Sequence, residues 1–513
     1  MKNSEEYRLD LLARASACWD AMSRFRTERE RCKRFTYGDQ WSDPMPNGAG
    51  AATEEDYIVA QGNIPLKNNL IRRLVRNVLG VFRNQWDMPR CEARDIEEAG
   101  EARAMERLLA YNIERNRLEE LYARTMEEFL ISGMAVHRKW FGKKGRNIDC
   151  WTDYVSPEHF FLDSDSRDFR NWDISIIGEY HDMTFQDIAS SFALKKEDYD
   201  RLSKIYYHSA VNGREYGKEE TYKVVEVWTK EYIPRYVCHD PLTGRCFRVG
   251  ERDLSRLVTY PNQIRRENGA DESSLISARW IMDEEWHYHF LTSEGIVLSK
   301  GKTPYSHGGH PYTLKLYPFI DGEIHSFVAD IIDQQKFTNR LISMYDWILR
   351  ASAKGVLLIP EGSLPEGVKI QDIAAEWSRF NGVIMFKPKA GEPIPQQINS
   401  KISSNGITDL LALQMEMMED IAGVNGALQG KLTNNSMSGT LYDQQTRNSL
   451  TALADLMQSY NDFILEGTKK DAHNIRQFYS QSRLNAILGD VPSLEARTNF
   501  FNSDFDFTSR IGE

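Results

Sequence analysis

The chain has 513 residues, of which 41% are hydrophobic and 27% charged, a balance typical of globular proteins and unlike that of disordered ones. Its formal net charge of −11 argues against a protein that holds nucleic acid through many basic contacts. No apolar run reaches the roughly 18 residues that cross a membrane, and the polar start "MKNSEEYRLD" shows no secretory signal, so we expect a cytoplasmic setting and no membrane partner.

Helical patterns occupy the first part of the chain. Apolar residues recur at helical spacing over residues 5–35, over "LKNNLIRRLVRNVLGVFRN" (66–84) and from 95 to 131, where the pattern stops near Gly133. The second pattern places five apolar side chains on one face: Ile71, Leu74, Val75, Val78 and Phe82. We therefore predict three helices in this section.

From residue 134 to 320 the apolar period changes to two, which is typical of strands. We predict strands in "MAVHRKW", "YKVVEVWTKEY", "RYVCHDPLTGRCFRV" and "EWHYHFLTSEGIVLS", and a short helix in "TFQDIASSF". Cys238 and Cys246 flank one of the turns. We expect them to be reduced strand residues, not a disulfide, because nothing in the sequence indicates export. This section is predicted to be mixed α+β.

After residue 320 long helices return. Helical patterns cover 327–353 and 403–422, and a last one begins near Ser438 and runs to 464. Between the first two lies a compact block, 354–400, predicted as strand–helix–strand with "VIMFKP" as its second strand. The short helix of this block aligns three large apolar side chains: Ile373, Trp377 and Phe380.

Segments that resemble nucleotide or calcium sites are incomplete. "GREYGKEE" at Gly213 is one residue short of a phosphate-binding loop, and Glu219 stands where the magnesium-binding hydroxyl should be. "DSDSRD" (Asp163–Asp168) begins like a calcium loop but lacks the loop glycine and the final glutamate. A turn with side-chain caps is the preferred interpretation, and we predict no catalytic residue, metal ligand or cofactor.

Four histidines are the remaining candidates for a metal site. His287 and His289 are spaced to share one face of a strand, and His307 and His310 follow nearby. No cysteine or acid is spaced to help them, so structural histidines are preferred. The alternative, a cytoplasmic metal- or nucleotide-dependent enzyme with an unrecognised site, would rest on His287, His289 and Asp163–Asp168.

A basic stripe lies on the second predicted helix. Arg72, Arg73, Arg76 and Arg83 recur among its apolar residues. A solvated face or a contact with a neighbouring subunit is the usual role of such a stripe, and contact with DNA is the third possibility. The sequence does not decide among them.

The last third of the chain resembles a known family. In "DQQKFTNRLISMYDWILRASAKGVLLIPEG", Gln335 followed by Asn339 and Arg340 opens a long helix that leads into a small strand–helix–strand block. Further on, in "NNSMSGTLYDQQ", the pair Ser438-Gly439 opens the next helix. "YGDQW" near the start and "SDFDFTSRIG" at the end fit the same order. This order resembles the portal proteins of tailed bacteriophages, most closely the short-tailed group.

The resemblance implies an α+β subunit of a ring, with an α/β wing, long stem helices, a small α/β clip and a Gly/Asn-rich tunnel loop. Because the chain stops at Glu513, the crown is expected to be either minimal or cut short. The implied divisions are as follows: wing 1–320, first stem helix 321–353, clip 354–400, second stem helix 401–423, tunnel loop 424–437, a long helix behind it 438–464, and a return to the wing or a short crown 465–513.

The implied tunnel loop is rich in residues that allow mobile turns and exchangeable hydrogen bonds. An ordinary flexible connection between helices is the alternative on the loop alone. One lysine per chain would become a ring of positive charge after assembly. The side chains expected to face DNA are Asn425, Gln429, Lys431, Thr433, Asn434, Asn435 and Ser436.

The family also implies partners and a location. The expected assembly is a homo-dodecameric ring at one capsid vertex of the virion, formed in the host cytoplasm, through which double-stranded DNA passes without sequence specificity. The expected protein partners are the terminase large subunit, a head–tail adaptor or tail proteins, the major capsid protein and the scaffolding protein. No catalysis is expected of such a conduit.

Overall fold

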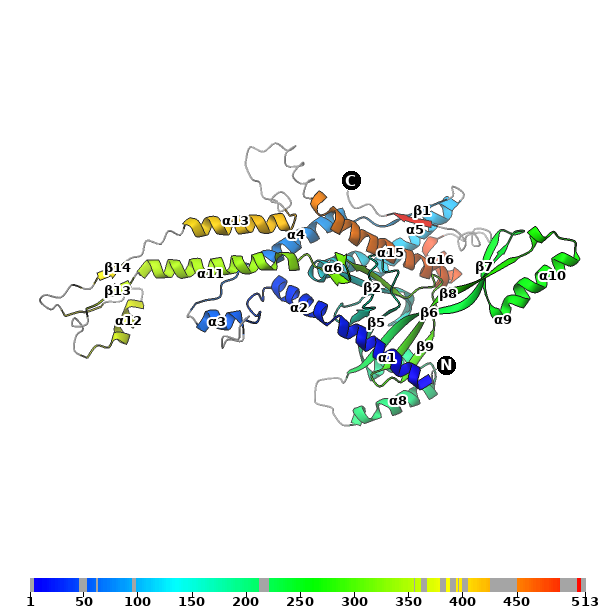
Figure 1. Cartoon of the computed structure of the whole chain (residues 1–513), viewed down its shortest axis with the longest axis horizontal. Helices are drawn as coiled ribbons and strands as arrows, with labels where there is room; N and C mark the ends of the chain where they lie inside the picture. The colour runs from blue at the N-terminus through cyan, green and yellow to red at the C-terminus, as the bar shows by residue number, and fades with distance from the viewer. Residues whose placement is uncertain are drawn as a thin grey trace, which may run out of the picture. The chain divides into compact units, whose positions relative to one another are not determined.

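The computed structural model describes most of the chain, in these ranges: 4–45, 53–60, 63–94, 98–211, 221–354, 356–360, 367–378, 384–387, 394, 396–398, 405–424, 450–489 and 505–508. The chain divides into two compact units. Unit 1 comprises Met1–Lys33, Asn77–Ala329 and Arg447–Glu513, and unit 2 comprises Arg34–Arg76 and Asp330–Thr446. Both contain helices and strands (Figure 1), so the fold class is mixed α+β. None of the described helices combines the length and apolar character needed to cross a bilayer.

Antiparallel sheets form the framework of unit 1. The largest has the order β4-β5-β6-β8-β9, with β7 also paired to β6. A second has the order β10-β2-β3, and β1 pairs with β15. The strands are β1 Arg90–Ala93, β2 Met134–Lys144, β3 Asn147–Tyr154, β4 Phe160–Leu162, β5 Ile176–Thr184, β6 Thr221–Asp240, β7 Arg245–Gly250, β8 Ser277–Thr292, β9 Val297–Lys302, β10 Tyr312–Leu316, β11 Phe319–Ile320, β12 Glu323–Ile324 and β15 Phe505–Thr508.

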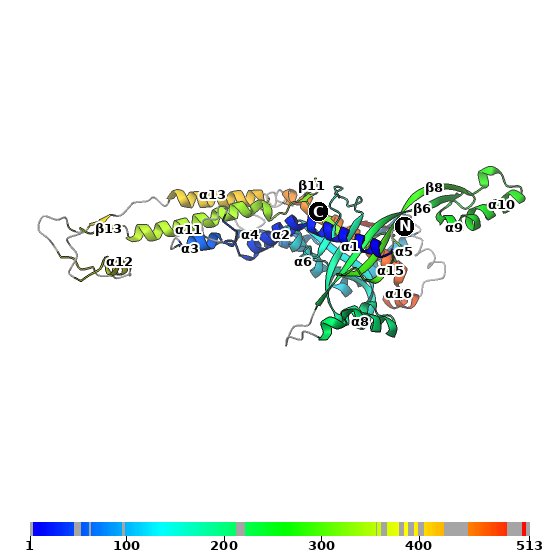
Figure 2. The same cartoon turned by 60° about the horizontal axis from the view of Figure 1, so that its bottom comes forward.

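Helices of unit 1 cover these sheets. α1 packs on the large sheet, α7 and α8 pack beside β5 and β6, and α15 contacts β2 and β10 (Figures 1 and 2). The helices are α1 Ser4–Ala21, α5 Ala99–Asn116, α6 Leu118–Ser132, α7 Phe185–Phe192, α8 Lys196–Val211, α9 Glu251–Leu254, η2 Ser255–Thr259, α10 Tyr260–Glu267, η3 Glu272–Ser274, α15 Ala454–Phe478 and α16 Gln481–Leu488. Three more span the divisions between units in the sequence: α2 Ser23–Tyr37, α4 Leu70–Gln85 and η4 Ala329–Ile331.

The core of unit 1 contains a buried ion pair. Lys139 on β2 donates from Nζ to Asp471 Oδ2 on α15 at 2.5 Å, and both side chains are buried. Asp471 raises the pKa of Lys139 against the opposing effect of burial. Because an unpaired charge in the same place would be costly, loss of either partner should weaken the contact between α15 and β2.

Two long helices dominate unit 2. α11 and α13 lie side by side, and β13, α12 and β14 follow the end of α11 (Figures 1 and 2). The elements are α3 Glu54–Ala60, α11 Ile332–Lys354, β13 Val356–Leu358, α12 Ile370–Ser378, β14 Gln396–Ile398 and α13 Asn405–Ile421. β13 and β14 are antiparallel partners.

Several local predictions are confirmed by the elements. The five apolar residues predicted to share a face in 66–84 are all buried on α4. α6 ends at Gly133 with a φ of 77°, where a Cβ would lie 2.2 Å from the His325 carbonyl oxygen. α7 begins after Thr184, whose side chain and that of Asp187 form a capping box. The segment "SDFDFTSRIG" near the C-terminus contains β15, which pairs with β1.

Other boundaries differ from the predictions. The pattern at 5–35 is two helices with a break at Met22, and the pattern at 95–131 breaks at Arg117, whose φ is 51°. Residues 384–387 of "VIMFKP" are not a strand, and the partner of β13 lies later, in β14. The last long helix runs to Phe478 instead of 464. Apolar spacing places helices better than it places their ends.

Two further segments differ from the simplest expectation. Residues 34–76, expected within the wing, group with residues 330–446 in unit 2. The segment 251–267, for which no helix was predicted, forms α9, η2 and α10 as one continuous helical stretch, in which Pro261 comes directly after the π-helical turn η2. Cys238 and Cys246 are free, and register offsets them by one residue, so they lie on opposite faces of the hairpin.

Candidate functional site

Gln335 and Asn339, two of the residues that carry the family resemblance, lie in a buried polar network of unit 2. Gln335 Oε1 accepts hydrogen bonds from the backbone nitrogens of Leu70 (2.9 Å) and Ile71 (3.2 Å). Its Nε2 donates to the Asn68 carbonyl oxygen at 2.7 Å and to Asn339 Oδ1 at 2.9 Å. The first N–H groups of a helix have no partner within that helix. Gln335 of α11 therefore caps α4.

Asn339 extends this network to the segment "YGDQW". Its Nδ2 donates to Gln40 Oε1 at 2.7 Å, and Gln40 Nε2 donates to the Phe35 carbonyl oxygen at 2.9 Å. Arg340, the third predicted anchor, is more exposed and pairs with Glu54 Oε1 at 3.2 Å. The structure thus joins the segment that begins at Gln335 to "YGDQW", and it shows that Gln335 and Asn339 hold these segments together by buried hydrogen bonds.

The predicted basic stripe divides into different environments. Arg73 Nη2 lies 2.8 Å from Glu419 Oε1 on α13, which is an ion pair within the chain that the sequence analysis did not consider. The guanidinium of Arg72 lies over the ring of Tyr37 at 4.7 Å. Arg76 is exposed. A role in contacting DNA or a neighbour therefore fits Arg76 better than Arg73.

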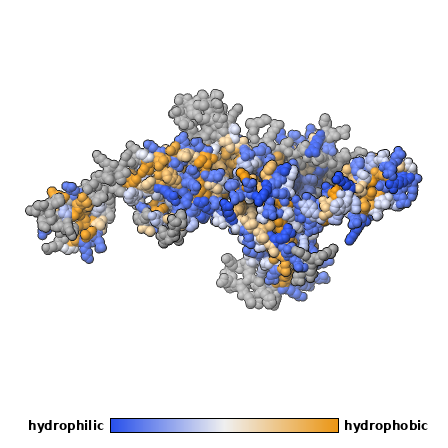
Figure 3. All heavy atoms as spheres, viewed as in Figure 1, coloured by the Kyte–Doolittle hydropathy of each residue, from blue (hydrophilic) through white to orange (hydrophobic). Residues whose placement is uncertain are grey.

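Apolar side chains are exposed along α11 and α13 (Figure 3). On α13 the residues 37–49% exposed are spaced by three or four positions: Leu410, Leu413, Met417 and Ile421. On α11 the apolar residues 41–50% exposed are Phe337, Met344, Trp347 and Leu349, of which the first three are spaced by seven and three positions. This spacing places each set on one face of its helix. A cavity of about 470 Å³, lined in part by Trp41, Met344 and Trp347, adjoins the face of α11.

The predicted clip and tunnel loop are described only in part. In α12, Ile373 is buried and Trp377 is half-buried, whereas Phe380 lies outside the described residues. The tunnel-loop residues Asn425 to Ser436, and the anchors Ser438 and Gly439, also lie outside them. Their roles stay predictions.

The four candidate histidines have separate surroundings. His287 Nε2 lies 3.1 Å from Glu285 Oε2, while buried His289 packs on the ring of Tyr7. Burial lowers the pKa of His289 to about 4. The His310 ring packs against Trp286 instead, with 4.8 Å between centroids. Among the described residues these histidines do not converge on one point, so the proposed metal pair has no geometric support.

The acidic segment Asp163–Asp168 is held by local hydrogen bonds. Asp163 Oδ1 accepts from the backbone nitrogen of Asp165 at 3.2 Å, and Asp168 Oδ1 accepts from that of Arg170 at 3.0 Å. Asp173 collects further donors, among them the Ser166 hydroxyl at 2.8 Å. These contacts are those of turns with side-chain caps, the interpretation preferred from the sequence.

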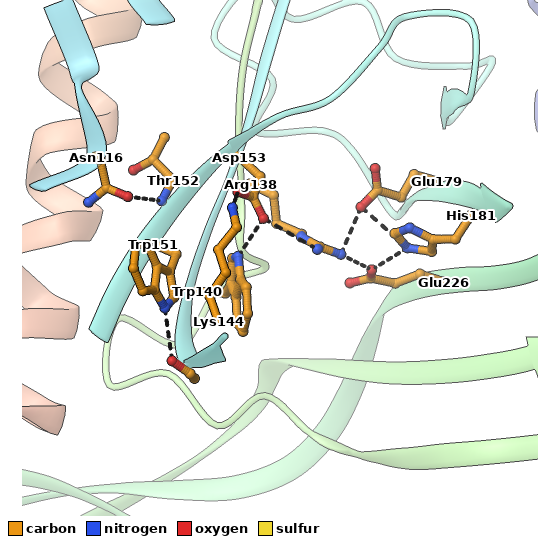
Figure 4. Close-up of polar contacts among 11 residues, drawn as sticks. Asn116, Arg138, Trp140, Lys144, Trp151, Thr152, Asp153, Glu179, His181 and Glu226 are labelled. Atoms are coloured by element: carbon orange, nitrogen blue, oxygen red, sulfur yellow. Dashed lines mark hydrogen bonds and ion pairs between the residues drawn. The ribbon is translucent and has the colours of Figure 1, made fainter. Parts of the chain in front are cut away.

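A buried charged cluster that the sequence analysis missed joins three strands of unit 1 (Figure 4). Arg138 Nη1 on β2 lies 2.9 Å from both Glu179 Oε1 on β5 and Glu226 Oε2 on β6. His181 Nε2 lies 2.8 Å from Glu226 Oε2 and 3.3 Å from Glu179 Oε1. We call these four residues the Arg138 cluster. Its only local trace in the sequence is a glutamate inside the apolar run "VVEVW".

The Arg138 cluster is arranged as an ion-pair network. Glu179, His181 and Glu226 could reach a single metal ion, but the Arg138 guanidinium occupies the position between the two carboxylates that a cation would take. Strand β5 comes close enough to β6 here that a Cβ on Gly178 would lie 2.0 Å from the Glu226 carbonyl oxygen. The site is therefore packed and charge-balanced by the chain itself.

Burial and pairing shift the pKa values of this cluster in different directions. Burial would raise the pKa of Glu226, but Arg138 and His181 outweigh it and lower the pKa to about 2. Burial raises the pKa of Glu179, and Arg138 offsets this only in part. For His181 burial lowers the pKa, but the hydrogen bond to Glu226 and the charges of Glu179 and Glu226 together outweigh it, so the pKa is raised. The cluster thus favours an ionised Glu226 and a protonated His181.

Nearly the whole chain is similar to one known protein family. Residues 12–496 match the family described as phage P22-like portal protein. A comparison with curated proteins returned no significant match. The match covers nearly the entire sequence and agrees with the order of motifs around Gln335, Asn339 and "YGDQW". The chain therefore belongs to the P22-like portal proteins, the structural head–tail connectors of short-tailed bacteriophages.

Proposed function

We propose that this protein assembles into a closed dodecameric ring at one vertex of the capsid, where it forms the conduit for packaging, retaining and ejecting the genome. The observation that carries the proposal is the pair of exposed apolar faces on α11 and α13, taken with membership of the portal family. Monomeric proteins rarely leave neighbouring apolar faces of this kind uncovered. A neighbouring copy is the partner that the family favours.

Contacts of this kind suit a ring. If the face of α13 on one copy packs against α11 on the next, the contact is heterologous, and a rotation that closes after twelve copies gives a ring. The cavity beside Trp41 and Trp347 has room for a side chain such as Met417 from that neighbour. Completing the burial of each half-exposed side chain would contribute about 1 kcal/mol, and a ring repeats the contact at every interface.

The passage of DNA is proposed to depend on residues 424–437. A chain with a net charge of −11 repels a polyanion over most of its surface, so a duplex would slide without being held. One Lys431 per copy would supply a weak ring of positive charge to centre it. Gly and Asn in this segment favour turns that can move with the duplex.

Partner proteins are proposed to dock at defined regions. The block 354–400, which includes β13, α12 and β14, would receive the terminase large subunit and later the head–tail adaptor or tail proteins. Unit 1 would face the major capsid and scaffolding proteins during assembly in the host cytoplasm. The role is structural, and the energy for DNA movement would come from the terminase.

The stem contact can be tested by charge insertion. In the variant L413D/M417D two aspartates would face the neighbouring copy, so the ring should be lost and a folded monomer should appear by native mass spectrometry. The matched control is I148D/L194D, which changes two exposed aliphatic residues of unit 1 and should leave the ring intact. A ring that survives L413D/M417D unchanged would contradict the proposed interface.

The loop proposal has a separate test. Replacing residues 428–435 by a Gly-Ser linker of equal length should leave the ring intact by native mass spectrometry but reduce the DNA packaged in an in vitro reaction. Loss of the ring in this variant would mean that the segment is a packing element and not part of the tunnel wall.

A further inference from the structure

A small cavity of unit 1 lies between the large sheet, the segment before β10 and α15. Its volume is about 270 Å³. Lys230 of β6 and Trp286 of β8 line it from the large sheet, His310 lines it from the segment before β10, and Lys470 lines it from α15. We call it the Lys230 cavity. The proposed contact between copies uses residues of unit 2, whereas these residues all belong to unit 1.

Two lysine ammonium groups at the Lys230 cavity have hydrogen-bond donors to spare. Lys230 Nζ donates to the Trp172 carbonyl oxygen at 2.9 Å, and Lys470 Nζ donates to the Tyr312 carbonyl oxygen. Among the residues that the structure describes, neither ammonium group has a further acceptor within hydrogen-bond distance. Since an ammonium group carries three N–H bonds, each lysine keeps two that a ligand in the cavity could use.

His310 supplies another donor. Its Nδ1 accepts a hydrogen bond from the backbone nitrogen of Tyr312 at 3.2 Å, so the proton of the neutral ring is on Nε2. In the described part of the chain this Nε2 has no acceptor. Burial lowers the pKa of His310, and the charges of Lys470 and Lys230 also lower it. Both ammonium groups are therefore close enough to act on this ring.

The lysines have counter-charges within the chain, but the partners differ in exposure. Glu284 Oε2 lies 3.7 Å from Lys230 Nζ, and Glu466 Oε1 lies 3.7 Å from Lys470 Nζ, which is too long for a hydrogen bond. The two lysine side chains are 9% and 15% exposed, whereas the glutamates are 56% and 48% exposed.

This difference leaves the ammonium groups only partly compensated. Solvent screens the exposed carboxylates more than the covered ammonium groups. The pKa of Lys470 reflects this, because burial lowers it in spite of the opposing effect of Glu466. The third cation of the lining, Arg170, is held by Asp168 with 3.0 Å between Nε and Oδ1, and it adds no free charge.

The donors indicate the class of ligand. N–H groups of lysine and histidine bind oxyanions through charge-assisted hydrogen bonds. A planar carboxylate is matched best by the fork of an arginine, but here the arginine already has its carboxylate. Separate point donors from β6, α15 and the segment before β10 suit a tetrahedral oxyanion. The cavity has room for such an ion together with water.

We propose that the Lys230 cavity binds a phosphate group through Lys230, Lys470 and His310. The bound group joins β6, α15 and the segment before β10 within one copy of the chain. A free phosphate ion and the phosphate end of a nucleotide share this chemistry. The proposal does not depend on the ring, because all three residues belong to unit 1.

The first test is isothermal titration calorimetry of the full-length protein with inorganic phosphate in a chloride buffer. We expect one phosphate per chain. The variant K230M/K470M keeps the apolar stems but lacks both ammonium groups, and it should bind at least about tenfold more weakly. The control K143M/K195M removes two exposed lysines elsewhere in unit 1 and should bind as the parent does. No binding by the parent, or equal binding by all three proteins, would overturn the proposal.

The second test uses the unaltered chain and so does not depend on the folding of a methionine variant. Lysines are acetylated with acetic anhydride, with and without phosphate, and the rates are followed by mass spectrometry. Phosphate at ten times its Kd leaves roughly one site in eleven free, so acetylation of Lys230 and Lys470 should slow about tenfold. Acetylation of Lys143 should not change. Equal rates at Lys230 and Lys470 with and without phosphate would overturn the proposal.

The same two measurements with thymidine monophosphate distinguish the two sources of the phosphate group. If the nucleotide binds more tightly than the free ion and protects Lys230 and Lys470, the ligand is the phosphate end of a nucleotide. If it binds more weakly, the ligand is the free ion. Protection of neither lysine by either compound would overturn the proposal for both sources.

Discussion

Units 1 and 2 differ in how they treat polar and apolar side chains. Unit 1 buries charges and pairs them within the chain, as in Lys139–Asp471 and the Arg138 cluster. Unit 2 also pairs buried charges, Asp43 and Glu54 with Lys336. In addition it buries the neutral amides of Gln335 and Asn339 and leaves apolar residues of α11 and α13 exposed. In unit 2, α11 and α13 each present an apolar face that another molecule can cover.

The largest expected effect concerns the buried pair of unit 1. Asp471→Leu would leave Lys139 charged in the core without a partner, and the free energy of unfolding should fall by about 3–5 kcal/mol. Guanidinium unfolding followed by tryptophan fluorescence measures it.

The matched double variant K139M/D471L removes both charges and should recover most of the loss. Two results would contradict this: a loss below about 1 kcal/mol for D471L, or a double variant no more stable than D471L. Either would mean that the pair does not organise the contact between α15 and β2.

Removing the buried amide of Gln335 in unit 2 should lower the free energy of unfolding by less, because the hydrogen-bonding groups left behind are neutral. Gln335→Leu leaves the N–H groups of Leu70 and Ile71 without their acceptor and should destabilise by about 2–3 kcal/mol. Hydrogen exchange at those two amides should accelerate. Gln334→Leu, the same substitution one position earlier at a half-buried site, is the control and should stay within about 0.5 kcal/mol. Unchanged exchange at Leu70 would rule out capping by Gln335.

A smaller effect is expected in α12. Because Trp377 is only half-buried, Trp377→Ala should cost about 1–2 kcal/mol locally, less than a full core deletion. Limited proteolysis of the segment around α12 measures it, with exposed Ile370 changed to Ala as the control. Equal cleavage of both variants would mean that Trp377 does not support this block.

The smallest effect is a pH dependence in unit 1. His181 has a raised pKa in the folded protein, so its contribution to stability is full below its ordinary value of 6.5 and is lost as pH rises through the folded pKa. The pKa of Glu226 is lowered to about 2 in the folded protein. Its contribution to stability is therefore full above pH 4.5 and is lost as the pH falls toward 2. His181→Gln should therefore flatten the decline in stability above pH 6.5. If the stability of the variant declines above pH 6.5 as steeply as that of the parent, the decline comes from other groups.

The comparison also explains what the sequence could and could not reveal. The buried face of α4 and the end of α6 at Gly133 follow from spacing and local backbone conformation. The cap that Gln335 places on Leu70 joins positions 265 residues apart, and no local pattern encodes such a pairing. The family pattern singled out Gln335 and Asn339 without giving the reason for them.

The Arg138 cluster was missed for the same physical reason. Its members come from three strands that only the sheet brings together, and only Glu226, inside an apolar run, hinted at a buried partner. The helices α9, η2 and α10 were not predicted because Pro261 and many charged residues obscured the helical spacing of their apolar residues. Candidate metal histidines, in contrast, were close in sequence yet have separate surroundings in the fold.

The central claim is that copies of this chain close around an axis through the exposed faces of unit 2. Electron microscopy of the purified protein, classified by view, tests it most directly. The account predicts top views with rotational symmetry and a central hole. Solitary compact particles at micromolar concentration, with the faces of α11 and α13 still exposed, would contradict it.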